Sequence, residues 1–189
     1  KHVDKVLYSH AHADQTHGIN DLRIFYLKKR KKIDVYTNIL TSKYLKKYFS
    51  YCFNDKKDYP AILSLKLLKK NFTFNFFGNK INIKSINVKH GSINCLAFII
   101  NGKCAYASDI NEIYKKDLKY FFKLDHFVVD CLRISPHPSH FSLKEVLSLI
   151  KIIKPKKTIL TNLHSDLDYN YLLKILPKNV KPAYDGLSF

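Results

Sequence analysis

The sequence of 189 residues contains no methionine, only 5 glycines, and no apolar run long enough to cross a bilayer. A membrane-spanning helix needs about 18 or more apolar residues in succession, so we expect no such helix and no membrane partner. The missing initiator methionine, with a predicted strand close to the first residue, indicates an N-terminally incomplete piece of a longer protein. We find no signal-peptide pattern at the start.

Cysteine is also scarce. The chain has 4 cysteines, at positions 52, 95, 104 and 131, and none of them forms a CxxC pair. Without a secretion signal, such cysteines are typical of buried free thiols rather than disulfides. We therefore expect a reducing compartment, the cytoplasm.

Acidic residues number 15 against 33 lysines and arginines, which leaves a net charge of +18. One interpretation is an anionic partner, such as a nucleic acid, a phosphate ester or a membrane surface. The other is a general bias toward lysine, which we favour because the lysines are spread along the chain. The densest basic run, residues 28–32, falls where a helix is predicted to end, and cations suit that place.

A histidine-rich segment follows the apolar run Val6–Tyr8. It contains His10, His12, Asp14 and His17 within eight residues. Imidazole and carboxylate groups are the usual ligands of zinc and similar ions, and positions 10, 12 and 14 share one face of an extended segment. The segment therefore predicts a metal site at the C-terminal end of a strand. The alternative is a solvated polar loop that happens to be rich in histidine.

The rest of the chain reads as a mixture of strands and helices in one domain over residues 1–189, since apolar residues make up 46%. Alternating or continuous apolar patterns predict strands at 3–8, 33–36, 72–76, 81–88, 96–100, 104–107, 127–130 and 158–161. Helical spacing predicts helices at 21–27, 41–51, 142–153 and 169–176.

Thr41 or Ser42 is expected to cap the second helix, and Ser142 with Glu145 forms a capping box for the third. Asn101-Gly102 predicts a hairpin turn. A mixed α/β sandwich with outer helices fits this order.

Further polar residues follow the ends of other predicted strands. They are His90, Asp109, His137, His140 and His164. Taken singly, each is most simply a residue of a surface loop. Together with His10 and His12 they place six of the nine histidines at strand ends, which is how a rigid sheet holds a multi-metal site.

The order of these motifs resembles the metallo-β-lactamase fold superfamily. The residues that carry the resemblance are His10-x-His12-x-Asp14, His90, Ser108-Asp109 and His164. The chain looks closer still to the branch of phosphoribosyl cyclic phosphate phosphodiesterases. The supporting motifs are His17–Arg23, Asp130-Cys131 before a histidine-containing loop, and Ala183–Leu187. The resemblance covers nearly the whole chain and implies an αββα sandwich, here lacking its N-terminal strands.

The resemblance also implies roles for individual residues. His10, His12 and His90 would hold one ion, Zn²⁺ or Mn²⁺, while Asp14 and His164 would hold a second. Asp109 would bridge the two ions. His140 matches the histidine that assists the leaving group or a phosphate oxygen, with His137 in support. In the mechanism that we favour, Asp14 would accept the proton of the attacking water or orient that water.

Two departures from the family pattern affect the second ion. The motif usually reads His-x-His-x-Asp-His, and Gln15 stands in the last place. A glutamine oxygen is a weaker ligand than imidazole, so the second site would bind weakly, prefer Mn²⁺ or stay empty, which leaves one or two ions per chain. His17 could substitute only if the helix start bends. The other departure is Asn162, which stands where related chains often place the ligand histidine, so that the role passes to His164 two residues on.

The favoured function is a metal-dependent phosphodiesterase acting through activated water on a small, cyclic or otherwise anionic phosphate ester. An RNA-processing nuclease of the same superfamily is the second interpretation, since the net charge favours nucleic acid, although no inserted basic arm is present. The third is a catalytically degenerate metal-binding module that acts through a partner. A homodimer is compatible with all three.

Overall fold

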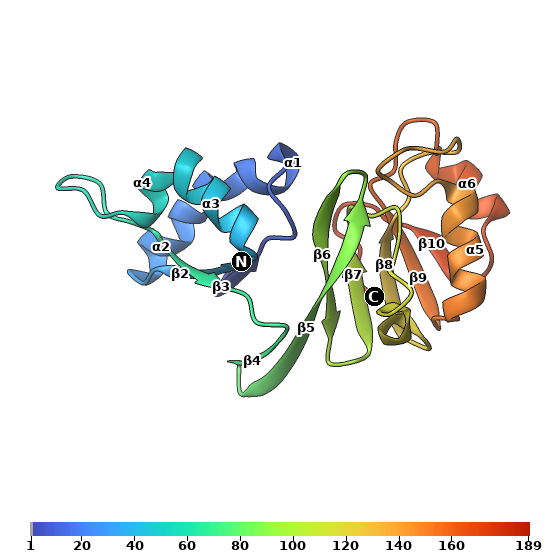
Figure 1. Ribbon diagram of the computed structural model, residues 1–189, viewed down its shortest axis with the longest axis horizontal. Coiled ribbons are helices and arrows are strands. Elements are labelled where there is room, and N and C mark those ends of the chain that lie inside the picture. The colour runs from blue at the N-terminus through green and yellow to red at the C-terminus, as the bar shows by residue number, and fades with distance from the viewer. Residues whose placement is uncertain (1) are drawn as a thin grey trace. The chain divides into compact units, whose positions relative to one another are not determined.

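The structure is a computed structural model that describes residues 2–189. The chain divides into two compact units, Lys1–Lys69 and Lys70–Phe189, and each has its own sheet and its own apolar core (Figure 1). The four cysteines are free thiols, as predicted, but only Cys52, Cys95 and Cys131 are buried, and Cys104 is half-buried. Among residues 2–189, no helix combines the length and the apolar character needed to cross a membrane.

The first unit is built on a parallel sheet of three strands in the order β1-β2-β3. The strands are β1 (Lys5–Leu7), β2 (Ile33–Thr37) and β3 (Leu63–Leu67). Its helical segments are α1 (Ala13–Thr16), η1 (His17–Leu22), α2 (Arg23–Lys29), α3 (Ile39–Tyr48) and α4 (Ser50–Phe53). The histidine-rich segment leaves the C-terminal end of β1, as the sequence predicts, and runs directly into α1.

Two predicted helix boundaries in this unit were wrong. α3 begins at Ile39, and its N-cap is Asn38, whose side chain accepts a hydrogen bond from the Thr41 amide. Asparagine caps at least as well as serine or threonine, so the earlier residue took the role that we expected of Thr41 or Ser42. The helix expected at 21–27 is divided between η1 and α2.

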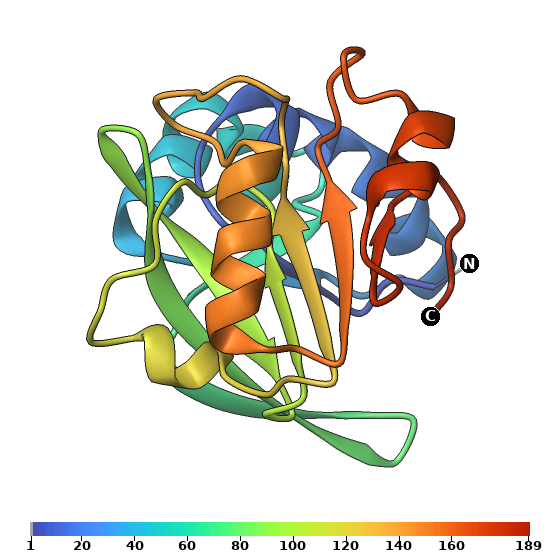
Figure 2. The ribbon, with the colours of Figure 1, turned by 90° about the vertical axis from the view of Figure 1, so that its right-hand side faces the viewer.

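The second unit contains a mixed sheet of seven strands in the order β10-β9-β8-β7-β6-β5-β4. The strands are β4 (Asn71–Phe76), β5 (Asn79–His90), β6 (Ile93–Ile100), β7 (Cys104–Ala107), β8 (His126–Asp130), β9 (Lys157–Thr161) and β10 (Val180–Pro182). Its helices are η2 (Leu118–Phe121), α5 (Leu143–Ile153) and α6 (Tyr169–Ile175). α5 lies across one face of this sheet (Figure 2), and its buried side chains Val146, Ile150 and Ile153 belong to the core.

The hairpin at Asn101-Gly102 and the capping box at Ser142 are confirmed. Asn101 and Gly102 both have positive φ, at 52° and 66°, as a tight hairpin turn requires. The Ser142 side chain accepts from the Glu145 amide, and the Glu145 carboxylate accepts from the Ser142 amide. The capping box therefore determines where α5 begins, directly after the loop that carries His137 and His140.

Strand direction brings four chain segments to one edge of this sheet. β5 and β7 are each antiparallel to β6, and β7, β8 and β9 are mutually parallel. The C-terminal ends of β5, β7, β8 and β9 therefore all lie at the same edge. The residues at those ends are the ones that the sequence singles out for their chemistry.

Candidate metal centre

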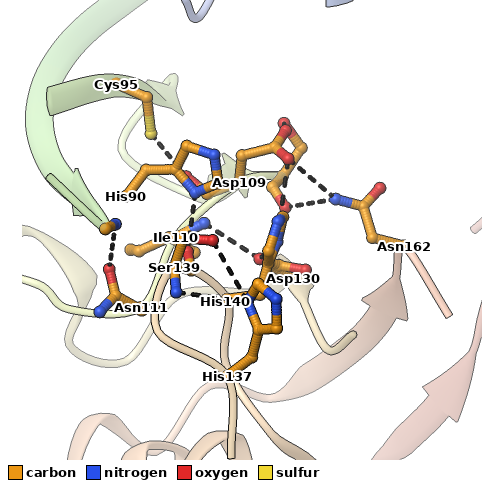
Figure 3. Close-up of polar contacts among 12 residues, drawn as sticks. His90, Cys95, Asp109, Ile110, Asn111, Asp130, His137, Ser139, His140 and Asn162 are labelled. Carbon is orange, nitrogen blue, oxygen red and sulfur yellow. Dashed lines mark hydrogen bonds and ion pairs between the residues drawn. The ribbon is translucent and has the colours of Figure 1, made fainter. Parts of the chain in front are cut away.

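Three of those residues form a compact donor cluster within the second unit. His90 ends β5, Asp109 follows β7, and His140 comes from the loop between β8 and α5. One ligand atom from each lies within 4.8 Å of the others, and Figure 3 shows the three side chains converging. Nδ1 of His140 lies 3.9 Å from Oδ1 of Asp109. Two imidazoles and a carboxylate are a donor set that suits zinc or manganese.

His90 is oriented by the backbone of the His140 loop. Its Nδ1 lies 2.7 Å from the carbonyl oxygen of Ser139. A carbonyl only accepts, so Nδ1 carries the proton and Nε2 keeps its lone pair. This is the usual way in which a protein fixes the tautomer of a metal-binding histidine.

Asp130 holds the His140 ring in place through a hydrogen bond. Its Oδ2 atom accepts hydrogen bonds from Nδ1 of His140 at 2.6 Å and from the Ile110 amide at 3.1 Å. Burial raises the pKa of this carboxyl to about 6, and the hydrogen bond from His140 acts in the opposite direction. With Nδ1 committed to Asp130, the His140 ring presents Nε2 as its other functional atom.

Asp109 is held by groups from β6 and from the residues that directly follow β7 and β9. Ser108 Oγ donates to its Oδ2 at 2.9 Å, and the Cys95 thiol donates to its backbone carbonyl. Nδ2 of Asn162 lies 3.4 Å from its Oδ1. The Asp109 carboxylate is 3% exposed, so its position is determined by these neighbours.

Two residues that the sequence did not single out support the loop. The Asn111 side chain accepts from the Gly91 amide at 2.9 Å and donates to the Pro138 carbonyl at 3.1 Å. It thus ties the end of β5 to the His140 loop. Arg133 donates to the Pro136 carbonyl at 2.7 Å. No local sequence pattern distinguishes either residue. The backbone partners of Asn111 are distant in the sequence, and Arg133 meets the Pro136 carbonyl only through the conformation of the loop.

His137 lies beside His140. Their ring centroids are 5.1 Å apart, and the Ser139 amide donates to Nδ1 of His137 at 3.3 Å. Burial and the neighbouring Arg133 lower the pKa of His137. It therefore favours the neutral form beside the cluster.

The first unit contains a second set of candidate donors. The rings of His10 and His12 approach edge to face with centroids 4.4 Å apart, and Ser9 Oγ lies 3.0 Å from Nδ1 of His10. Asp14 follows in α1, where its carboxylate accepts from the Gln15 side chain at 2.9 Å. Partial burial raises the pKa of Asp14, but the hydrogen bonds from Gln15 and its own backbone amide, with the nearby histidines, hold it below the usual value.

His164 and His17, which the sequence analysis considered as ligands of the second ion, make other contacts in the structure. His164 is largely exposed, and its Nδ1 lies 3.2 Å from Oδ1 of Asp166. The residue from that loop that faces Asp109 is Asn162 (Figure 3). His17 begins η1 and packs edge to face against Phe49, with centroids 5.7 Å apart.

Comparison with known families identifies the fold. Residues 1–162 match the model of the beta-lactamase superfamily domain. The chain belongs to this family. It has the metallo-β-lactamase-like α/β fold, whose members are metal-dependent hydrolases, and the fold implies divalent metal ions. His90 and Asp109 are donors of the type that such an ion takes, and His140 lies in the same cluster.

Several solved structures share this fold. A diphosphatase from the PhnP family is 27% identical with a TM-score of 0.87, over 99% of this chain and 70% of that one. The metallo-beta-lactamase fold protein YhfI from Bacillus subtilis is 16% identical with a TM-score of 0.74, over 97% and 76% of the two chains. The short form of human tRNase Z is 15% identical with a TM-score of 0.66, over 97% and 77%.

One curated relative has a different name. An octanoyltransferase from Porphyromonas gingivalis is 27% identical over 188 residues. The match covers 98% of this chain but only 37% of that protein. The chain therefore spans well under half the length of this relative.

Proposed function

We propose that this member of the beta-lactamase superfamily is a phosphodiesterase that hydrolyses a small anionic phosphate ester, such as a cyclic phosphate. The observation that carries the proposal is the pair of the buried Asp130 and the half-buried His140 beside the His90 and Asp109 donors. The similarity over nearly the whole chain to a diphosphatase of the PhnP family supports phosphorus chemistry.

We assign His90 and Asp109 as ligands of a divalent ion, Zn²⁺ or Mn²⁺. His10 and His12 of the first unit are likewise proposed metal ligands, as the family resemblance implies. When bound, the ion supplies Lewis-acid chemistry: it lowers the pKa of water and offsets negative charge on phosphoryl oxygens.

His140 is the proposed general acid. Its Nδ1 is held by Asp130, so Nε2 is the atom that would donate a proton to the leaving alkoxide oxygen. Asp130 does not contact the substrate in this scheme. It keeps the ring in one orientation and stabilises the positive charge that the ring carries as imidazolium. His137, in contact with His140, supports this position.

Asp14 has the remaining catalytic role. Because its pKa is held below the usual value, it is a weak base and is better suited to orienting a water molecule than to taking its proton. The net charge of +18 is compatible with an anionic substrate. We further propose that the protein works in the cytoplasm, where its thiols stay reduced.

The test is an assay of the metal-loaded full-length protein on bis(p-nitrophenyl) phosphate, a cyclic ribose phosphate and a diphosphate ester. We expect turnover that His140→Ala lowers about 100-fold or more while the bound metal is kept. His2→Ala is the matched control, since His2 is exposed and pairs with Asp4. Retention of full activity by His140→Ala would refute the assigned acid.

The same assay separates the rival functions. Salt-sensitive cleavage of RNA with no turnover of small esters would favour a nuclease. Transfer from an octanoyl thioester would favour the activity named for the Porphyromonas gingivalis relative, although most of that protein lies outside the matched region. Bound metal without turnover on any substrate would favour a degenerate module that acts through a partner.

A further inference from the structure

Three lysines of the second unit converge on the side chain of Tyr120. The ammonium nitrogens of Lys84, Lys119 and Lys70 lie 4.1, 5.3 and 5.9 Å from the centroid of its ring. They come from β5, from η2 and from the residue before β4. Because three separate segments supply the lysines of this Tyr120 cluster, it is a product of the fold and not of a lysine-rich run.

The backbone holds the cluster together within the second unit. The carbonyl of Lys70 accepts a hydrogen bond from the Ser85 amide at 2.9 Å, which keeps Lys70 beside the part of β5 that carries Lys84. The Tyr120 side chain is half-buried and packs against the core of this unit. The ring is therefore held from the inside, while Lys70 and Lys119 are exposed and Lys84 is half-buried.

No carboxylate pairs with the three lysines within the part of the chain that the structure describes. Lys89 of the same unit pairs with Glu112, but Asp117, two residues before Lys119, forms no ion pair with the cluster. Residues 70–108 include five lysines and no aspartate or glutamate. A tyrosine ring attracts an ammonium group through its face, but it carries no net charge. The mutual repulsion of three cations is thus left without an opposite charge.

We propose that Lys70, Lys84 and Lys119 bind a phosphate-bearing anion with two or more negative charges beside Tyr120. Phosphate oxygens accept charge-assisted hydrogen bonds from several ammonium groups at once, and their charge would remove the repulsion within the cluster. The Tyr120 hydroxyl, which makes no hydrogen bond with any residue that the structure describes, is a further donor at the end of the same ring.

This site is distinct from the metal centre. Lys84 precedes His90, the last residue of β5, by six residues, which corresponds to about 20 Å along a strand. The inference therefore does not depend on the phosphodiesterase activity. The phosphate group can come from a small free anion, such as a diphosphate, or from the backbone of a single-stranded RNA.

Lysine footprinting tests the site residue by residue. The metal-loaded full-length protein is acetylated briefly with and without sodium pyrophosphate, at an ionic strength held constant with potassium chloride, and modified lysines are quantified by peptide mass spectrometry. We expect pyrophosphate to reduce modification of the cluster lysines several-fold. Exposed lysines of the same unit that form no ion pair serve as controls and should react as before. They are Lys151, Lys174 and Lys178.

A triple variant measures the contribution of the charges. Replacing each cluster lysine by glutamine keeps most of the side-chain stem but removes the ammonium group. Isothermal titration with pyrophosphate should show binding at this site about 10–100-fold weaker than in the wild type. The titration is repeated after chelation, so that binding at the metal centre is subtracted. The matched control replaces the three control lysines by glutamine, which removes the same net charge, and it should bind as the wild type does.

A further arm of the footprinting uses a single-stranded RNA oligonucleotide in place of pyrophosphate. Protection of the cluster by pyrophosphate alone would identify a small free anion as the ligand. Protection by RNA at a lower concentration of phosphate groups would identify a strand backbone, with the salt dependence typical of nucleic-acid binding. No protection of the cluster by either probe, or equal protection of the control lysines, would overturn the proposal. The wild-type footprint gives this answer even if the triple variant folds poorly.

Discussion

Nδ1 of His140 lies 2.6 Å from Oδ2 of Asp130, a carboxylate that has no exposed surface. The same oxygen accepts the Ile110 amide, which follows Asp109 directly in the chain. One buried atom thus connects the proposed general acid to the segment that carries the Asp109 ligand. Such an arrangement makes the position of His140 sensitive to any change at residue 130.

Replacement of Asp130 tests this connection. Asp130→Asn keeps the shape of the side chain but removes the negative charge, and we expect turnover to fall about 10–100-fold with metal content unchanged. Steady-state kinetics with elemental analysis of each preparation measures both quantities. Asp58→Asn, at an exposed position, is the control. Equal activity of the two variants would show that Asp130 has no positioning role.

Gly91 is expected to be intolerant of any side chain. Its φ is +59°, and an added Cβ would lie 2.8 Å from Cβ of Ser139, the residue whose carbonyl orients His90. Gly91→Ala should cost the left-handed penalty of about 1–2 kcal/mol and a further 1–3 kcal/mol for the clash. It should also weaken metal binding, because the His90 ring loses its fixed partner.

Gly102→Ala is the matched control for that variant. Gly102 has a similar φ of +66°, but nothing lies within 4 Å of an added Cβ. It should show the backbone penalty alone, with metal affinity unchanged. Thermal unfolding and isothermal titration with Zn²⁺ compare the two, and equal effects on both quantities would contradict the role given to the close approach of Gly91 and Ser139.

Metal binding should stabilise the folded protein. A ligand at about 100 times its dissociation constant contributes about 2.7 kcal/mol, which corresponds to a rise in Tm of about 5–10 °C in a chain of this size. Differential scanning fluorimetry with Zn²⁺, followed by a chelator, measures the rise and its reversal. His90→Ala should abolish the shift, and a shift of wild-type size in that variant would argue against His90 as a ligand.

Asp34 makes a pH-dependent contribution to the stability of the first unit. Its carboxylate pairs with Lys5 and with Lys66, each at 2.9 Å. Partial burial raises its pKa, but the hydrogen bonds from the two lysines outweigh that effect and hold the pKa below the usual value of 3.8. Since the folded-state pKa is depressed, the stabilisation is present above pH 3.8 and is lost as the pH falls through the lower folded-state value.

Asp34→Asn should therefore lower the free energy of unfolding by about 1 kcal/mol at pH 7, and the difference from wild type should shrink toward zero in acid. Urea unfolding at several pH values measures this difference. A difference that stays constant from pH 7 to pH 3 would show that the effect of the substitution is not electrostatic.

Local sequence determined much of the second unit. The Asn101-Gly102 turn and the Ser142 capping box act over a few residues, so their patterns predict the structure directly. The short strand β10 was not predicted, because three residues that end in Pro182 carry too little periodicity. The histidine-rich segment and the family could likewise be predicted from the sequence, since spacing and motif order are properties of the chain itself.

Only the tertiary structure decided which side chains meet. In the sequence, Asp130 is only part of a motif. The structure shows that it is buried and bound to His140. Asn111 carries no signal of its own, and the sequence marked Asn162 only as a departure from the family pattern. The contacts of both come from backbone groups of Gly91, Pro138 and Ser108 that are distant in sequence. Ligand spacing is therefore visible in a sequence because it is local. The hydrogen bonds that orient those ligands come mostly from other strands and loops, and their partners are known only once the chain has folded.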